Sequence, residues 1–203
     1  MFVSTLFRSF VVKEEQEATL NTKLQNIATI TTGYYGQAEP EADLVCLQAR
    51  NFDDNGSLVE VLYPELKATF KTKKHLLKDG DVLFAAKGSR SFATCYRLKD
   101  YPTAVASTTF FIIRLFENAT KNVIPEYLVW VLNHASTKQK IIQTSSGSAV
   151  NSLSKSFLTE LEIEVPTIET QKRIVTISNL LLKKVCYKKN LFFKGNSHTN
   201  ATY

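Results

Sequence analysis

Cysteine is scarce in this sequence of 203 residues, with Cys46, Cys95 and Cys186 far apart and odd in number. This spacing excludes a disulfide framework, and the lack of a CxxC pair indicates a reducing, cytoplasmic setting. Long apolar runs are also missing, because no stretch approaches the roughly 20 residues that a membrane helix needs. The apolar opening, Phe2–Val12, is interrupted by Arg8 and lacks a basic start, so we expect neither a signal peptide nor a membrane partner.

Catalytic signatures are missing as well. The three histidines, His75, His134 and His198, show no metal-binding spacing. The sequence contains no glycine-rich phosphate loop and no GxSxG segment around a nucleophile. We therefore expect no catalytic residue, no metal ion and no cofactor.

One pattern has the form of a metal-dependent nuclease site. Asp54, followed by Glu65 and Lys67, has the spaced Asp and Glu-x-Lys arrangement in which two carboxylates hold magnesium and a lysine polarises the attacking water. In the simpler interpretation, Asp54 belongs to an Asp-Asn-Gly turn, and Glu65 and Lys67 lie on a solvated edge. A magnesium-dependent nuclease stays open as an alternative function.

Acidic residues are absent from the last part of the chain. Residues 170–203 carry seven basic and no acidic side chains, and residues 67–99 carry nine basic and two acidic ones. Residues 1–66 carry four basic and ten acidic side chains, within a net charge of +6. Such segregation is typical of a protein that presents one face to a polyanion and another to a protein partner, although solvated helical lysines give the same pattern.

Hydrophobic periodicity predicts a domain that mixes strands and helices. Segments that are rich in β-branched and aromatic residues, or that alternate in polarity, are predicted to be extended: Leu44–Arg50, Leu58–Tyr63, Val82–Lys87, Phe92–Leu98, Ala104–Phe116 and Leu161–Val165. Helical segments are predicted at Lys23–Ala28, at Pro125–Asn133 with proline at the start, at Ser136–Ile142, and from Ile168 to about Phe193.

Two loops carry side chains suited to nucleic acid. The predicted strand Val82–Lys87 leads into a basic loop with two hydroxyls, whose donors suit phosphate oxygens and whose Arg90 can reach a guanine edge. The earlier loop, Gly33–Gln37, pairs two tyrosines with a glutamine, which can contact base edges or phosphates. The alternatives are an ordinary hairpin with solvated charges and a pair of tyrosines that only pack. The basic excess of residues 67–99 favours DNA contact for the first loop.

Several short motifs follow one another in a fixed order along the chain. They are Lys23-Leu24, Ile27-Ala28 and Thr32-Gly33 near the start, then Gln48-Ala49-Arg50-Asn51, Leu77–Leu83 with Lys87-Gly88, Pro125–Leu128 with Leu132-Asn133, Gly147–Leu153, Leu161–Pro166 and Glu169–Ile174. Over about residues 22–190, this ordered set resembles a target recognition domain of the specificity subunit of type I restriction–modification systems.

The resemblance implies a mixed α/β (α+β) DNA target recognition domain over residues 21–166, followed by a long C-terminal helix, 167–194, of the coiled-coil spacer type. Residues 1–20 are expected to be a leader segment, and residues 195–203 a flexible tail. A subunit of this family is not catalytic alone; it recognises a sequence in double-stranded DNA and directs methyltransferase (modification) and restriction subunits. Because the family's usual form has two such domains and two paired helices, this chain resembles a half-subunit. A truncated subunit that only binds the assembly partner is the alternative.

The predicted loops supply the candidates for DNA contact, which are Tyr34, Tyr35, Gln37, Arg50, Asn51, Lys87, Ser89, Arg90, Ser148 and Asn151. On the last helix, an apolar stripe is predicted from helical spacing and consists of Ile174, Ile177, Leu181 and Val185. We expect this stripe to pair two copies of the chain antiparallel, as a homodimer. If the helix instead folds back onto the domain, the chain is a monomer.

Overall fold

The computed structural model describes the backbone of residues 19–85, 91–145 and 154–196, and the side chains of the last helix as far as Lys184. Its strands are, in chain order, β1 (Leu20–Lys23), β2 (Ala28–Thr32), β3 (Leu44–Leu47), β4 (Pro64–Leu66), β5 (Val82–Ala85), β6 (Ala93–Cys95), β7 (Ala104–Ala106), β8 (Phe110–Leu115) and β9 (Glu162–Val165). Its α-helices are α2 (Phe70–Lys73), α3 (Pro125–Asn133), α4 (Ala135–Ser145), α5 (Lys155–Glu160) and α6 (Ile168–Asn196). Short 3-10 turns are η1 (Leu24–Asn26), η2 (Ala49–Asn51) and η3 (Ala119–Lys121).

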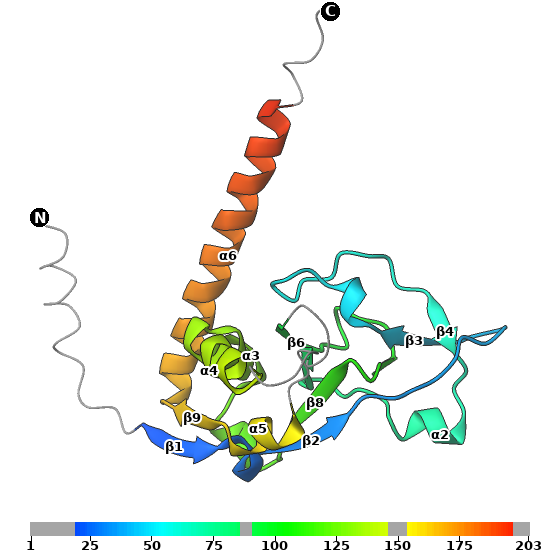
Figure 1. Cartoon of the computed structure of the whole chain (residues 1–203), viewed down its shortest axis with the longest axis horizontal. Helices are drawn as coiled ribbons and strands as arrows, with labels where there is room; N and C mark the ends of the chain where they lie inside the picture. Colours follow the sequence, from blue (N-terminus) through cyan, green and yellow to red (C-terminus); the bar gives the residue numbers. More distant parts are fainter. Residues whose placement is uncertain (1–18, 86–90, 146–153, 197–203) are drawn as a thin grey trace, which may run out of the picture.

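An antiparallel sheet in the order β2-β8-β5-β6 crosses the middle of the molecule (Figure 1). Both faces of this sheet are buried. On β5, Val82 and Phe84 contact one hydrophobic core, and Leu83 and Ala85 contact another. Since successive side chains of a strand point to opposite faces, a sheet that is covered on both sides needs apolar residues at every position. This requirement explains why β5 and most of β8 are unbroken apolar runs.

Helix α3 covers one face of the central sheet. Pro125 occupies its start, where the missing N–H costs nothing. Tyr127, Leu128 and Leu132 share one side of the helix and are buried against the sheet. The Tyr127 hydroxyl donates to the Glu164 carbonyl oxygen at 2.7 Å, so α3 is also tied to β9, which pairs antiparallel with β1.

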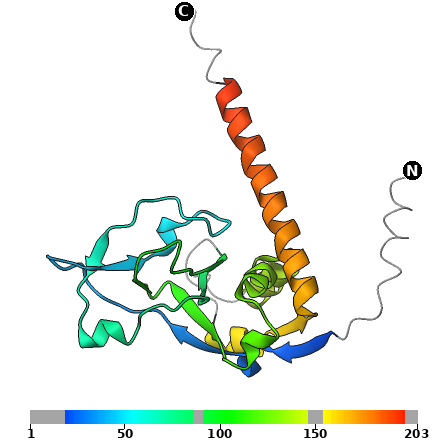
Figure 2. The ribbon, with the colours of Figure 1, turned by 180° about the vertical axis from the view of Figure 1, so that it is seen from behind.

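The other face of the central sheet is covered by a smaller sheet, in which β3 pairs antiparallel with β4 and parallel with β7. Phe52, which follows β3, lies 5.8 Å from Phe92 and 5.9 Å from Phe110 between ring centroids. These rings join the two sheets through a shared aromatic core. We call the part that carries the smaller sheet the outer lobe (residues 33–78 and 98–107). The other described residues, including α6, form the inner body; Figure 2 shows both from behind.

Helix α6 begins against the inner body and continues away from it (Figures 1 and 2). Ile174 and Val175 pack against the core that α3 covers. Leu180 and Leu181, farther along, are 62% and 59% exposed. Within the described residues, none of the helices has the length and apolarity required to cross a membrane.

Strands β5 and β9 and helix α3 lie where the sequence predicts them, but the extended run predicted at Leu58–Tyr63 is wrong. The Asp53 carboxylate closes the predicted turn by accepting hydrogen bonds from two backbone N–H groups. Beyond that turn, in the described chain, the pairing continues only as an isolated bridge from Phe52 to Leu58. Leu62 packs against a hydrophobic core, but Val59, Val61 and Tyr63 are 58%, 74% and 71% exposed, so little burial holds this segment against the sheet. Strand β4, farther along, takes its place beside β3.

Several other predicted elements have different bounds, and the predicted helix Lys23–Ala28 is instead the 3-10 turn η1 between β1 and β2. The predicted strand Ala104–Phe116 is divided into β7 and β8, because the Phe110 N–H donates to the Ser107 carbonyl oxygen and turns the chain. Helix α4 begins one residue before its predicted cap, Ser136, whose hydroxyl instead contacts His134 Nδ1 at 2.9 Å. Helices α2 and α5 are too short for their periodicity to predict them.

Candidate nucleic-acid interface

The loop that follows β2 is anchored to the outer lobe at its start. Gly33 passes so close to Ser107 that a Cβ atom would lie 2.0 Å from the Ser107 carbonyl oxygen. The Tyr34 N–H donates to the Ala106 carbonyl oxygen at 2.7 Å. The Tyr34 ring is half-buried, packs on the small apolar cluster between β3, β4 and β7, and lies 5.0 Å from the His75 ring. This geometry gives Tyr34 a packing role, as in the alternative interpretation of the tyrosine pair.

Beyond Tyr34 the same loop exposes its other predicted contacts. Tyr35 is 74% exposed, and Gln37 is exposed as well. The Glu39 N–H donates to the Glu65 carbonyl oxygen at 3.0 Å, so the loop runs beside β4. A tyrosine and a glutamine on an anchored loop, with their polar groups in solvent, are able to meet base edges or phosphates.

The turn after β3 gives its two predicted contacts different roles. Asn51 is 8% exposed; its Oδ1 accepts from the Gln48 N–H at 2.7 Å, and its Nδ2 donates to Glu60 at 2.9 Å. The Asn51 amide therefore holds η2 together, and its hydrogen bonds are made within the protein. Arg50 is exposed, and its Nη2 lies 3.4 Å from Glu65 Oε1 in an ion pair. Arg50 faces solvent as predicted, with part of its charge compensated by Glu65.

The residues of the nuclease alternative do not converge. Asp54 lines a groove of about 440 Å³ bounded by β6, α3 and α6. Glu65 lines a different groove and accepts a hydrogen bond from Arg50, while Lys67 lies 3.8 Å from Glu41. Among the residues that the structure describes, no three His, Cys, Asp or Glu side chains gather where they could hold a metal ion. The arrangement therefore does not favour a magnesium nuclease.

Five further candidates lie outside the described residues, namely Lys87, Ser89, Arg90, Ser148 and Asn151. The described residues beside the first three are firmly held. The Ala85 N–H donates to the Phe92 carbonyl oxygen at 2.8 Å. Asn133 of α3 bonds both backbone groups of Ala93, accepting from its N–H at 2.9 Å and donating to its carbonyl oxygen at 2.8 Å. Asn133 thus takes the place of a neighbouring strand at the edge strand β6.

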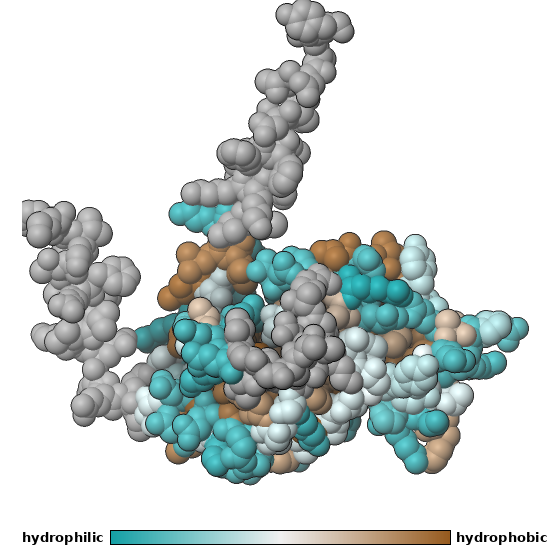
Figure 3. Space-filling model, in the orientation of Figure 1, coloured by the Kyte–Doolittle hydropathy of each residue, from teal (hydrophilic) through white to brown (hydrophobic). Residues whose placement is uncertain are grey.

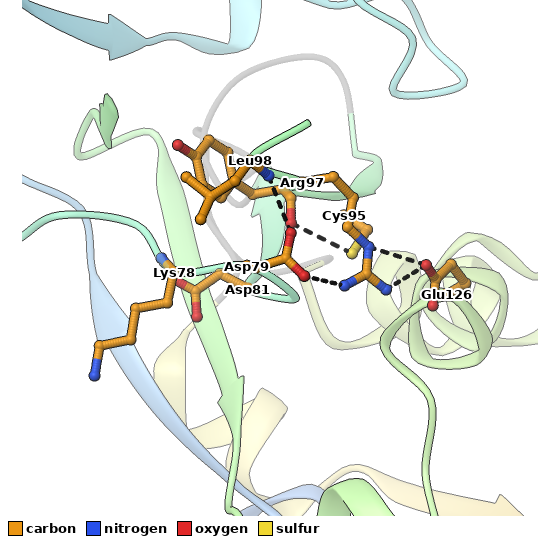
Figure 4. A network of polar contacts seen from close by, with 8 residues as sticks. Lys78, Asp79, Asp81, Cys95, Arg97, Leu98 and Glu126 are labelled. Atoms are coloured by element: carbon orange, nitrogen blue, oxygen red, sulfur yellow. Dashed lines mark hydrogen bonds and ion pairs between the residues drawn. The ribbon is translucent and has the colours of Figure 1, made fainter. Parts of the chain in front are cut away.

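An arginine ties the end of β6 to helix α3 (Figure 4). The Arg97 guanidinium donates to Glu126 through Nε at 3.0 Å and to Asp79 through Nη1 at 2.8 Å, and its Nη2 also contacts Glu126. The Leu98 N–H donates to Asp79 at 3.0 Å. This hydrogen bond, together with Arg97, lowers the pKa of Asp79 below its ordinary value. The network fixes the turn before β5 against the first turn of α3.

Two motif residues that sequence reasoning did not single out are buried polar groups of the scaffold. The Asp81 carboxylate is 1% exposed and accepts two hydrogen bonds from the Arg114 guanidinium, at 2.7 Å from Nε and 2.6 Å from Nη2. Gln171 is fully buried; its amide donates to two carbonyl oxygens at 2.7 and 2.8 Å and accepts from the Ile124 N–H at 3.0 Å. Gln171 therefore locks the start of α6 to the segment before α3. The sequence feature that could have identified these two residues is their position inside the motifs Leu77–Leu83 and Glu169–Ile174.

The predicted stripe is divided along the length of α6 into a covered part and an exposed part. Ile174 packs against the inner body. Ile177 and Leu181 are 58% and 59% exposed, and Leu180 beside them is 62% exposed. The side chain of Val185 lies outside the described residues. Figure 3 shows apolar surface on the part of α6 just above the body.

Comparison with known proteins adds a sequence match and a fold match. The family of type I restriction modification DNA specificity domains matches residues 54–190. No curated protein matches the sequence at a significant level. The fold is similar to a chain solved in a study of complex assembly and conformational transition in the type I R-M system, with 15% identity and a TM-score of 0.62. That match covers 96% of this chain and 47% of the other.

Two further solved structures are similar. The HsdS subunit from Thermoanaerobacter tengcongensis shares 16% identity with a TM-score of 0.57, over 89% of this chain and 41% of that one. The S subunit of a type I restriction-modification system from M. genitalium shares 11% identity with a TM-score of 0.58, over 91% and 44%. The chain thus spans less than half the length of each solved chain. Because the family match covers more than half of the sequence, the protein belongs to the family of type I restriction modification DNA specificity domains.

Proposed function

We propose that the chain recognises a specific sequence in duplex DNA for a type I restriction–modification complex. The observation that carries this proposal is the family match over residues 54–190. The geometry supports it, because a sheet that is buried on both faces and held by Asn133 and Arg97 forms the scaffold, and β2 of that sheet leads into the loop that exposes Tyr35 and Gln37. Binding residues are characteristically placed on loops that a rigid scaffold supports.

The proposed contacts are the exposed candidates among the described residues, together with the candidates outside them. Gln37 reads a base edge, since a glutamine amide pairs with adenine through two hydrogen bonds. Tyr35 contacts a base or a sugar, and Arg50 binds a phosphate. The proposal keeps the candidates outside the described residues, with Lys87 on a phosphate and Arg90 on a guanine edge: Lys87, Ser89, Arg90, Ser148 and Asn151. It leaves out Tyr34 and Asn51, which pack and cap within the outer lobe.

Selection of duplexes from a randomised pool tests this function. The full chain is expected to enrich one motif, which it binds at least about 10³-fold more tightly than a random duplex at the same salt concentration. Retention of duplexes without any sequence enrichment would contradict sequence recognition. Incubation of the selected duplex with Mg²⁺ is the control, because cleavage by the purified chain would support the nuclease instead.

The proposed partners are the methyltransferase (modification) and restriction subunits of such a complex, which the chain directs without catalysis of its own. A mixture of the chain with a type I modification subunit is expected to methylate the selected duplex, whereas the chain alone is not. A chain that binds the modification subunit but leaves every duplex unmethylated would support the alternative, a subunit that only binds the assembly partner.

The proposed complex contains two copies of the chain, paired through α6. The helix has 29 residues, or about 44 Å at 1.5 Å per residue, and Ile177, Leu180 and Leu181 are exposed along one side of it. Contiguous exposed apolar side chains mark partner sites. Antiparallel pairing of two α6 helices, as a coiled-coil spacer, would cover this surface, and two copies together approach the length of the solved chains. A two-fold axis would make the recognised DNA sequence symmetric and split.

Sedimentation equilibrium at micromolar concentration tests the pairing. The parent is expected to have twice the mass of the chain, and Ile177→Asp with Leu181→Asp is expected to be a monomer. The matched control, Thr176→Asp with Asn179→Asp, adds the same charge to another side of α6 and is expected to stay dimeric. A monomeric parent, or a dimer that survives the Ile177 and Leu181 substitutions, would reject helix-mediated pairing.

A further inference from the structure

The segment around helix α2 carries concentrated positive charge. Between residues 67 and 78 the chain has five lysines and no acidic residue. Residues 33–66, which precede it in the outer lobe, have seven acidic residues and one basic residue. The outer lobe therefore changes from acidic to basic where β4 leads into α2, and this side of the lobe is distinct from the rest of its surface.

The lysines of α2 and of the residue after it are exposed and uncompensated. Within the described residues, no ion pair involves Lys71, Lys73 or Lys74. The Lys74 Nζ lies 4.4 Å above the ring of Phe70, which is 80% exposed. An exposed aromatic ring beside one ammonium group, with two further exposed lysines on the same short helix, suits a ligand that is both anionic and partly apolar. Nucleic acid has this combination, because its phosphates alternate with sugars and bases.

Helix α2 is held firmly although it is a single turn. The Thr69 N–H donates to Thr72 Oγ1 at 2.7 Å, and the Thr72 N–H donates to Thr69 Oγ1 at 3.2 Å. Thr72 is 3% exposed, and the Ala68 N–H donates to Asp43 at 2.6 Å, so the turn is bonded to the body of the lobe. The lysines on either side of Thr72 project from this fixed base. In Figure 3 the projection at the lower right, which is α2 in Figure 1, is hydrophilic with an apolar spot.

Helix α2 also lies next to the proposed contact loop, Gly33–Gln37. His75, just after α2, contacts the Tyr34 ring at 5.0 Å. Tyr34 is the residue directly before Tyr35, and the loop runs on beside β4, which leads into α2. The basic surface and the exposed polar loop are therefore neighbouring parts of one side of the outer lobe.

We infer that α2 is a backbone-binding element for duplex DNA, in which Lys71, Lys73 and Lys74 bind phosphates and Phe70 packs against the sugars and base edges between them. This inference rests on the proposed function and adds to it a contact that does not depend on sequence. The lysines supply affinity and hold the duplex in register, while the loop that carries Tyr35 and Gln37 reads the sequence.

The salt dependence of binding tests this role. Binding of the full chain to a random-sequence duplex is measured between about 50 and 200 mM salt. Each phosphate contact that is lost reduces the magnitude of the negative slope of log K against the logarithm of the salt concentration by about 0.9. The variant Lys71→Ala, Lys73→Ala, Lys74→Ala is therefore expected to have a slope that is less steep by about 2 to 3. Phe70→Ala is expected to weaken binding about tenfold and to keep the parent slope.

Two control variants distinguish a direct effect of the α2 lysines from an effect of net charge and from an effect on folding. Lys121→Ala with Lys155→Ala and Lys172→Ala removes equal charge from the inner body and is expected to keep the parent slope. The variant Lys71→Arg, Lys73→Arg, Lys74→Arg keeps the charge of α2 and is also expected to keep the slope. An α2 alanine variant with the parent slope, or an equal loss in the inner-body variant, overturns the inference while the parent's selected motif still upholds the proposed function. A parent that binds no duplex overturns both.

Discussion

Two arginine–carboxylate pairs show how the inner body and the outer lobe differ. In the inner body, Arg114 donates twice to Asp81, at 2.7 and 2.6 Å, and the carboxylate is 1% exposed. In the outer lobe, Arg50 makes one contact of 3.4 Å with Glu65, and the Arg50 side chain is 64% exposed. The first pair is bidentate and its carboxylate is shielded from water, with the Arg114 side chain 37% exposed, so it fixes geometry; the second is solvated and contributes little to stability.

The same contrast holds for the other side chains of the two regions. The inner body buries its polar motif residues, such as Gln171, in complete hydrogen-bond networks. The outer lobe exposes large side chains on its loops and on α2, where Tyr35, Val61, Tyr63 and Phe70 are 71% to 80% exposed, while the inner body exposes apolar side chains chiefly on α6. The comparison teaches that buried polar motif residues such as Asp81 and Gln171 maintain the scaffold, whereas the surface left for recognition consists of exposed side chains such as Tyr35 and Gln37.

The largest expected effect comes from breaking the buried pair. Asp81→Asn removes one charge of a buried pair and leaves Arg114 uncompensated, so the free energy of unfolding should fall by about 3 kcal/mol. Glu65→Gln, the matched change in the outer lobe, should lower it by less than about 1 kcal/mol. Urea unfolding of both variants measures the difference. Equal losses would show that the two regions do not differ in the way described.

A slightly smaller effect is expected at the start of α6. Gln171→Ala leaves two carbonyl oxygens and the Ile124 N–H without their partner, and should lower the free energy of unfolding by about 2 to 3 kcal/mol. Gln25→Ala, at an exposed glutamine of the inner body, should change it by less than about 0.5 kcal/mol. Thermal unfolding of the two variants checks this prediction, and a stable Gln171→Ala protein would contradict it.

In the outer lobe, the substitution Gln37→Ala is expected to change DNA recognition and not the free energy of unfolding. Gln37→Ala should leave the free energy of unfolding within about 0.5 kcal/mol of the parent. Discrimination at one base pair of the selected motif should fall by about 1 to 3 kcal/mol, the worth of a bidentate contact. Titration of duplexes that differ at single positions measures the loss. Gln139→Ala, on the exposed side of α4, is the control and should bind every duplex like the parent.

The smallest expected effect concerns Asp79, at the point where the inner body meets the outer lobe. The pKa of Asp79 is lowered in the folded state by the Leu98 N–H and by Arg97. Ionised Asp79 therefore stabilises the fold above its ordinary pKa of 3.8, and this contribution disappears as the pH falls through the lowered folded value. Between about pH 5 and about pH 2, the free energy of unfolding measured in urea should fall less for Asp79→Asn than for the parent. If the free energy of unfolding falls equally in both proteins over this pH range, ionised Asp79 does not stabilise the fold.

The sequence predicts the inner body better than the outer lobe, for a physical reason. Strand β5 and helix α3 are determined by local patterns, because one is apolar at every position and the other begins at Pro125. The segment Leu58–Tyr63 has the composition of a strand, but Leu62 packs against a core while Val59 and Val61 stay exposed. Which segment pairs with β3 depends on burial across the whole fold, and local composition does not carry that information.

The candidate site shows the same limit. Tyr34 and Tyr35 are identical residues in sequence, yet the contacts of β7 and His75 hold the first and leave the second in solvent. Asn51 has the chemistry of a base reader but is occupied by the backbone of Gln48 and by Glu60. Composition identifies residues that can contact DNA; only the tertiary contacts decide which of them are available.

The most direct test of the account compares the duplex motif selected by the parent with that selected by a variant of the outer lobe. The variant combines Tyr35→Ala, Gln37→Ala and Arg50→Ala, all at exposed side chains. We predict that it unfolds in urea like the parent and no longer enriches the parent's motif from a randomised pool. A variant that enriches the same motif with the same affinity would contradict the claim that the outer lobe reads the sequence.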